Sequence, residues 1–187
     1  MDRWTTGYTA LELREAEKRF GLRFPPDLFE LLRQRRPVNG YDWLKDHAAI
    51  ERALLHPLEG LLFDVEQNGL WWPEWGARPG SRDERASIVT DIVWSAPRLI
   101  PLIGHRYLPE LPDARGNPVF SVMQSDAIYY GRDLADYFRR EFGDAAEPVI
   151  GPVRYIPFWS DLVERRSEPA CSPGGDAKDG TGSAGPL

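Results

Sequence analysis

The sequence offers few residues that could carry out catalysis. Of its three histidines, His105 is the best placed to act as a general base, because the other two fall in an expected helix and at its end. Ser121 lies in an apolar run typical of a strand, and the sequence contains no Gly-x-Ser-x-Gly turn of the kind that presents a nucleophilic serine. The sequence therefore predicts that Ser121 is a strand residue whose hydroxyl group forms a hydrogen bond with a neighbouring polar group. It predicts no catalytic residue.

A metal site would have to use scattered side chains. The candidate ligands are Asp64, Glu66, Glu74, His105 and Asp126. Their spacing matches neither an EF-hand loop nor a His-Glu-x-x-His helix, and the single cysteine, Cys171, offers no thiolate cluster for zinc. We therefore expect no metal and no cofactor. A small metal-dependent hydrolase that uses His105 and nearby carboxylates is the less favoured alternative.

The most unusual run is 71–79, Trp-Trp-Pro-Glu-Trp-Gly-Ala-Arg-Pro. Its proline and glycine interrupt regular structure, which places the run at the surface, where binding residues concentrate. Tryptophan and arginine are also the residues that most often dominate the energy of a protein interface. A Pro- and Asp-rich loop, expected at 107–117, would add carboxylates to this surface. The predicted partner-binding residues are Trp72, Glu74, Trp75, Arg78, Glu110 and Asp113.

The same tryptophans also have a purely structural interpretation. Adjacent side chains of an extended chain point to opposite sides, so one of Trp71 and Trp72 can be buried while the other is exposed. All three rings of the run could instead cover the sheet. The sequence leaves both interpretations open.

The apolar pattern predicts helices first, then strands, then a helix. The first helix is expected at 9–19, where Thr9 and Glu12 form a capping box and Gly21 is a good terminator; a second helix ends at Pro37. The later expected elements are a short helix around 50–55 that Pro57 ends, a strand at 61–65, a helix at 81–94, strands at 98–103, 119–123 and 127–130, a helix at 133–142 and a short helix at 158–165.

This order indicates an α+β fold in a single domain, with a twisted, mainly antiparallel sheet and helices packed against it. We place the domain at residues 1–166. The segment 167–187 is rich in Gly, Ser, Pro and Ala and has almost no large apolar residue, so we expect a disordered polar tail.

Charge and composition limit the classes of partner. The formal net charge is −6 and the isoelectric point is about 5.2, whereas a nucleic-acid-binding protein usually presents a basic face. No apolar run approaches the roughly 20 residues that span a bilayer, and residues 1–7 lack the pattern of a signal peptide. We expect a cytoplasmic protein with a protein partner and with neither nucleic acid nor membrane as a partner.

Several short motifs, in this order along residues 9–143, resemble the SUKH superfamily, whose members carry the SMI/KNR-type domain. The matching segments are Phe20-Gly21-Leu22-Arg23-Phe24-Pro25-Pro26-Asp27-Leu28 followed by Leu31-Leu32, Asn39-Gly40 with Trp43, Pro57-Leu58-Glu59-Gly60 with Phe63-Asp64-Val65, Leu99-Ile100-Pro101-Leu102, and Ala127 to Gly131 with 133–138. Many relatives have a Gly-Asp-aromatic-apolar-Asp run after the proline-containing strand. Here 104–109 reads Gly-His-Arg-Tyr-Leu-Pro, which indicates a divergent branch.

The resemblance implies an α+β domain without a shared catalytic motif. Many bacterial members resemble immunity proteins that bind and neutralise toxins, and fungal relatives are linked to the regulation of cell-wall assembly. We therefore expect a non-enzymatic protein-binding module, an immunity protein whose acidic, aromatic-bearing face covers a basic site of a cognate toxin. An intracellular regulatory or scaffold protein is the alternative.

Overall fold

The structure is a computed structural model that describes residues 2–143 and 151–167. Its helices are α1 (Ala10–Phe20), α2 (Pro26–Gln34), α3 (His47–Gln67), α4 (Arg82–Ser95), α5 (Leu134–Phe142) and α6 (Trp159–Ser167), with a short 3-10 helix, η1, at Pro73–Trp75. Its strands are β1 (Trp4–Thr6), β2 (Arg35–Pro37), β3 (Leu99–Ile103), β4 (Arg106–Pro109), β5 (Val119–Met123) and β6 (Asp126–Gly131). Strand β1 pairs with β2, and β3 to β6 form an antiparallel sheet in chain order, which confirms the predicted α+β class.

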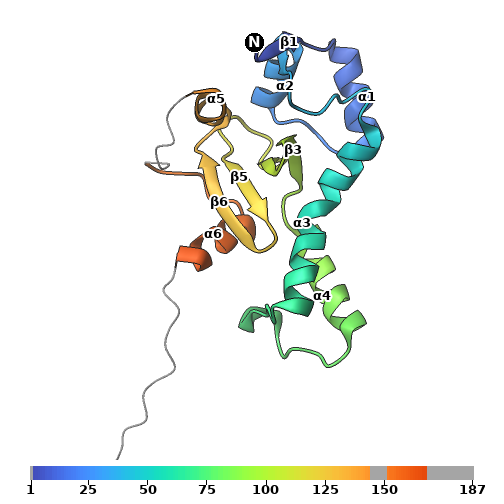
Figure 1. The fold of residues 1–187 in the computed structure, drawn as a ribbon, viewed down its shortest axis with the longest axis vertical. Helices are drawn as coiled ribbons and strands as arrows, with labels where there is room; N and C mark the ends of the chain where they lie inside the picture. Colours follow the sequence, from blue (N-terminus) through green and yellow to red (C-terminus); the bar gives the residue numbers. More distant parts are fainter. Residues whose placement is uncertain (1, 144–150, 168–187) are drawn as a thin grey trace, which may run out of the picture.

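The four-stranded sheet is covered on both faces. Successive residues of a strand point to opposite faces, and Val119 and Phe120 accordingly enter two different apolar clusters. The first cluster joins the sheet to α1, α2, α5 and the start of α3, and the second joins it to the end of α3, α4 and α6. In Figure 1, α3 runs past the β3 edge of the sheet from the N-terminal helices to α4, and α6 lies beside β6 at the other edge.

The predicted caps of the first helix are present. The Glu12 backbone N–H donates to the Thr9 hydroxyl oxygen at 3.2 Å, and the Thr9 N–H donates to the Glu12 carboxylate at 2.7 Å. Gly21, at φ +61°, ends the helix in the left-handed conformation that favours glycine.

The prediction for residues 47–67 was wrong. The structure has one continuous helix, α3, where the sequence predicts a short helix ended by Pro57 and then a strand at 61–65. Proline has no N–H, so it cannot donate to the Ala53 carbonyl one turn earlier. That carbonyl oxygen instead accepts a hydrogen bond from the Tyr107 hydroxyl at 3.1 Å, so the helix continues without an unpaired group at this point.

The apolar run that resembled a strand follows the helical period. Leu61 and Val65 are both completely buried and lie one turn apart, whereas Phe63 between them is half-exposed. A short apolar run does not by itself distinguish a strand from a buried helix. The segment from Pro57 to Val65, one of those that resemble the SUKH superfamily, is therefore helical in this protein.

The structure has three strands that the sequence analysis does not expect, which are β1, β2 and β4. Strand β4 occupies the start of the stretch expected as a loop at 107–117, because a tight turn at Gly104, with φ +55°, returns the chain along β3. Residues Arg35–Pro37, expected to end a helix, pair as β2 with β1. Ser167, the first residue of the expected tail, ends α6, and the rest of that tail, 168–187, lies outside the described residues.

Candidate protein-binding site

The tryptophan run forms a packed aromatic group at the end of α3. The Trp75 ring lies 5.4 Å from that of Trp71 and 4.7 Å from that of Trp72, between ring centroids. Trp72 also packs on Phe158, at 5.7 Å, and all three tryptophans of the run are half-buried against the second apolar cluster. This arrangement supports the interpretation in which these rings cover the core.

The charged residues predicted beside these rings have partners within the chain. Glu74 pairs with Arg165 at 2.7 Å, and the hydrogen bond from this guanidinium lowers the pKa of Glu74. The same guanidinium lies 4.2 Å from the centroid of the Trp72 ring. Arg78 donates to the Val65 carbonyl oxygen at 2.6 Å, which ties the run to the end of α3.

The two predicted loop carboxylates, Glu110 and Asp113, have different neighbours from the tryptophan run. Asp113 is 3.5 Å from the Arg23 guanidinium, and Glu110 accepts a hydrogen bond from the Arg23 backbone N–H at 2.9 Å. Of the six predicted residues, the structure therefore brings Trp72, Glu74, Trp75 and Arg78 together beside α3, and it places the other two with Arg23.

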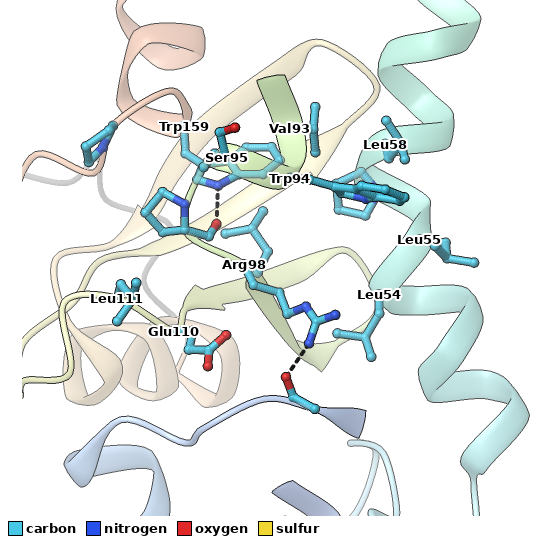
Figure 2. A pocket seen from close by; sticks show the side chains of 16 residues that line it. Leu54, Leu55, Leu58, Val93, Trp94, Ser95, Arg98, Glu110, Leu111 and Trp159 are labelled. Atoms are coloured by element: carbon cyan, nitrogen blue, oxygen red, sulfur yellow. Dashed lines mark hydrogen bonds between the residues drawn. The ribbon is translucent and has the colours of Figure 1, made fainter. Parts of the chain in front are cut away.

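Glu110 borders the groove that we call the Trp94 groove, which has a volume of about 880 Å³. One wall is the outer face of α3, and the other is formed by the end of α4 and the residues that follow it. The lining side chains include Leu54, Leu55, Leu58, Val93, Trp94, Arg98, Glu110, Leu111 and Trp159 (Figure 2).

Three large apolar side chains on this groove are open to solvent. Trp94 is 72% exposed, Leu111 52% and Leu55 48%. The seven tryptophans all lie in described residues, and Trp94 is the only one of them that is exposed. Large exposed apolar residues that line one groove mark interaction sites more often than singly scattered apolar residues do.

The position of Trp94 on α4 explains its exposure. Val89 and Val93, one turn apart, face the core and are buried, and the next residue along a helix points about 100° away. Trp94 therefore shares its face with Thr90 and the exposed Asp91. The sequence carried this signal, a tryptophan outside the apolar stripe of its helix, but the tryptophan run at 71–75 drew the prediction instead.

The base of the groove is held by two fixed side chains. The Trp159 indole N–H donates to the Pro97 carbonyl oxygen at 2.6 Å. The Arg98 guanidinium donates to the carbonyl oxygens of Phe20 and Gly21, at 3.0 Å and 2.7 Å, where α1 ends without further helical donors. Figure 2 shows the bond from Trp159 to Pro97 and the bond from Arg98 to Gly21 as dashed lines.

The Glu110 carboxylate accepts a single hydrogen bond among the described residues, from the Arg23 backbone N–H. No salt bridge within 2–143 and 151–167 includes it. Burial raises the pKa of Glu110, and the N–H of Arg23 and the charges of Arg98 and Arg23 oppose this effect only in part.

The residues weighed for catalysis lie elsewhere. Ser121 is buried in β5 and accepts a hydrogen bond from the Arg106 guanidinium at 2.8 Å, as predicted for a strand residue. His105 is half-buried in the turn between β3 and β4, where burial, followed by the charge of Arg106, lowers its pKa.

The carboxylates weighed as metal ligands have separate partners. Asp64 is buried and accepts hydrogen bonds from the Ser125 backbone N–H at 2.8 Å and from the Asn68 side chain. Glu66 pairs with Arg85, and Asp126 pairs with Arg166. Among the described residues, no three His, Cys, Asp or Glu side chains form a group that could hold a metal ion.

Comparison with known proteins found no matching family model, no matching curated protein and no matching solved structure. None of the helices in the described part of the chain combines the length and the apolar character needed to cross a membrane.

Proposed function

We propose that the protein is a non-enzymatic protein-binding module that uses the Trp94 groove, and that it acts as an immunity protein that binds and neutralises a toxin domain. The observation that carries the binding proposal is the exposure of Trp94 beside Leu55 and Leu111 on one groove. Tryptophan is one of the residue types most enriched at the hot spots of protein interfaces. The toxin as partner rests on the resemblance of the sequence to the SUKH superfamily.

The mechanism proposed is occlusion. A partner seated on the groove would bury the Trp94 ring, whose large apolar area contributes binding energy without a chemical step. The formal net charge of −6 favours the approach of a partner with a basic surface.

The test starts from the genes that flank the gene for this protein, and any toxin domain encoded there is co-expressed with it. The wild-type protein should restore the growth of cells that express the toxin, and the purified proteins should form a complex by titration calorimetry. Trp94→Ala should weaken the complex. The Leu11→Ala variant is the control, because Leu11 is an equally accessible apolar residue, 70% exposed, that does not line the groove.

Growth that the wild-type protein fails to restore would contradict the immunity function. A complex that leaves the toxin active would favour the scaffold alternative instead. Circular dichroism of both variants separates lost binding from lost folding, since truncation of an exposed side chain usually changes the free energy of unfolding by less than about 0.5 kcal/mol.

A further inference from the structure

A second pocket lies where β1, α2 and α5 meet, away from α4 (Figure 1). We call it the Trp4 pocket. It has a volume of about 600 Å³, which is within the usual range of small-molecule sites in proteins. It shares no lining residue with the Trp94 groove, so the two sites are separate.

Three aromatic rings form the apolar wall of the Trp4 pocket. The Trp4 ring lies 4.8 Å from that of Phe138 and 5.1 Å from that of Phe142, and the two phenylalanine rings are 5.6 Å apart, between centroids. All three side chains line the pocket and are only half-buried. A planar ring of a ligand can therefore join this group in the tilted or edge-to-face contacts that aromatic rings prefer.

Two arginines beside these rings lack an anionic partner. The guanidinium carbon of Arg35 lies 4.2 Å from the centroid of the Trp4 ring, and that of Arg3 lies 5.8 Å from the centroid of the Phe142 ring. Among the described residues, neither guanidinium takes part in a salt bridge or a hydrogen bond. A guanidinium over an aromatic ring uses its flat face, so the N–H groups in its plane stay available to an anion.

The other charged groups of the Trp4 pocket already have partners. Asp133 caps α5 and accepts a hydrogen bond from the Asp136 N–H at 2.8 Å, and Asp27, in the first turn of α2, accepts one from the Gly116 N–H at 3.0 Å. Both carboxylates lie at helix N-termini, where the helix dipole stabilises negative charge. The third arginine of the pocket, Arg139, pairs with Asp136 at 2.6 Å.

We propose that the Trp4 pocket binds a small organic anion with a planar apolar ring. The ring packs against the three aromatic side chains, and the acid group pairs with the guanidinium groups of Arg35 and Arg3. An anion is the complementary ligand because these two cations are the charges of the pocket without a partner in the described part of the chain. This inference goes beyond the proposed function and does not depend on it.

The probes are naphthoate and naphthamide, which share one ring system and nearly one shape but differ in charge. Each is titrated into the isotope-labelled full-length protein while the indole N–H signals of the seven tryptophans are followed by NMR. The variants Trp4→Phe and Trp94→Phe assign two of these signals. Naphthoate should shift the Trp4 signal and leave the Trp94 signal in place. Naphthamide should bind about tenfold more weakly, the effect of losing one hydrogen bond between charged groups.

Substitutions of Arg35 test the role of the cation. Arg35→Gln should weaken the binding of naphthoate by about tenfold and change that of naphthamide little. Arg35→Lys keeps the charge and should bind naphthoate with an affinity between those of Arg35→Gln and the wild type. Arg19→Gln is the matched control, because Arg19 is exposed on α1 and does not line the pocket. The remaining indole signals report whether each variant is folded.

Equal affinities for naphthoate and naphthamide would overturn the proposal, because charge would then not select the ligand. Equal losses in Arg35→Gln and Arg19→Gln would overturn it as well, since the attraction would then come from the general charge of the protein. A Trp4 signal that naphthoate does not shift, up to the limit of its solubility, would also contradict the site. A shift of the Trp94 signal in its place would assign the ligand to the Trp94 groove.

Discussion

Tyr107 and Tyr137 are buried tyrosines whose hydroxyl groups lie in contrasting surroundings. The Tyr107 hydroxyl donates to the Ala53 carbonyl oxygen that Pro57 leaves without a helical donor. The Tyr137 hydroxyl is buried and has no hydrogen-bond partner among the described residues. Burial is the main cause that raises the pKa of each phenol, so both remain protonated donors at neutral pH.

Replacing each tyrosine with phenylalanine should therefore have different effects. Tyr107→Phe should lower the free energy of unfolding by about 1–3 kcal/mol, because it leaves the Ala53 carbonyl buried and unpaired. Tyr137→Phe should be neutral or stabilising, since it removes a buried hydroxyl that gains no bond on folding. Urea denaturation measures both values. Equal losses in the two variants would contradict the assignment of the Tyr107 hydrogen bond to α3.

Asp136, in the first turn of α5, gives the structure a pH-dependent contact. Burial alone would raise the pKa of this carboxyl, but hydrogen bonds from Arg139, Arg140 and the Arg132 backbone N–H outweigh it and hold the pKa well below its usual range. A carboxyl with a depressed pKa in the folded state stabilises the protein above its unfolded pKa of about 3.9, and the contribution is lost as the pH falls below that value.

Asp136→Asn should consequently destabilise the protein by about 1–3 kcal/mol at pH 7, the typical range for hydrogen bonds to a charged group. The difference from the wild type should shrink at pH 3, where the wild-type carboxylate begins to lose its advantage. Asp126→Asn is the control, because that carboxylate is exposed and pairs with Arg166 at the surface. Urea titrations at pH 7 and at pH 3 measure the free energy of unfolding of each protein. A difference between the wild type and Asp136→Asn that does not depend on pH would contradict the charged contact.

At the scale of the elements, α3 is the helix that local sequence patterns failed to predict in full. The capping box of α1, the strands around 119–130 and the helix at 133–142 depend on neighbours in the chain, and the structure has all of them. The continuity of α3 through Pro57 depends on Tyr107, which is distant in the sequence. A local pattern cannot contain that information.

The packing of α3 against the turn between β5 and β6 depends on Gly60. A Cβ atom at this position would lie 2.7 Å from the Gln124 Cα atom, which is backbone and cannot rotate away. Gly60→Ala should destabilise the protein by about 1–3 kcal/mol through overpacking. The direction of the change in stability is informative, because replacing glycine with alanine inside a helix would otherwise stabilise the protein by about 1 kcal/mol.

Gly80→Ala is the matched control for this prediction. Position 80 has no atom within 4 Å of the added Cβ and no positive φ, so the substitution should change stability little. Thermal unfolding followed by circular dichroism compares the two. If Gly60→Ala is the more stable variant, then α3 and the β5–β6 turn do not pack as closely as the structure has them.

The candidate site was predictable only in part, for a reason that belongs to the whole molecule. Glu110 was named from the sequence and lines the groove, whereas Trp94 was treated as the end of a helix. Whether a tryptophan is buried depends on which elements cover it, and here the sheet is covered on both faces while the outer side of α4 is left open. The dense run at 71–75 is half-buried because η1 and α6 pack together beside the second cluster.

This distribution makes Trp94 a reporter for the whole chain. Of the seven tryptophans, six are buried or half-buried and Trp94 is 72% exposed, so collisions with a dissolved quencher should fall mainly on its ring. Trp94→Phe should lower the slope of acrylamide quenching of tryptophan fluorescence and shift the remaining emission to shorter wavelength.

Trp4→Phe is the control, because the Trp4 ring is covered by Phe138 and the Arg35 guanidinium, and its loss should leave the exposed emission in place. A protein partner seated on the Trp94 groove should lower the quenching slope of the wild type and of Trp4→Phe, and it should have little effect on Trp94→Phe. If the slope is the same in Trp94→Phe and in the wild type, Trp94 is covered in solution, and the groove is not the open surface on which partner binding depends.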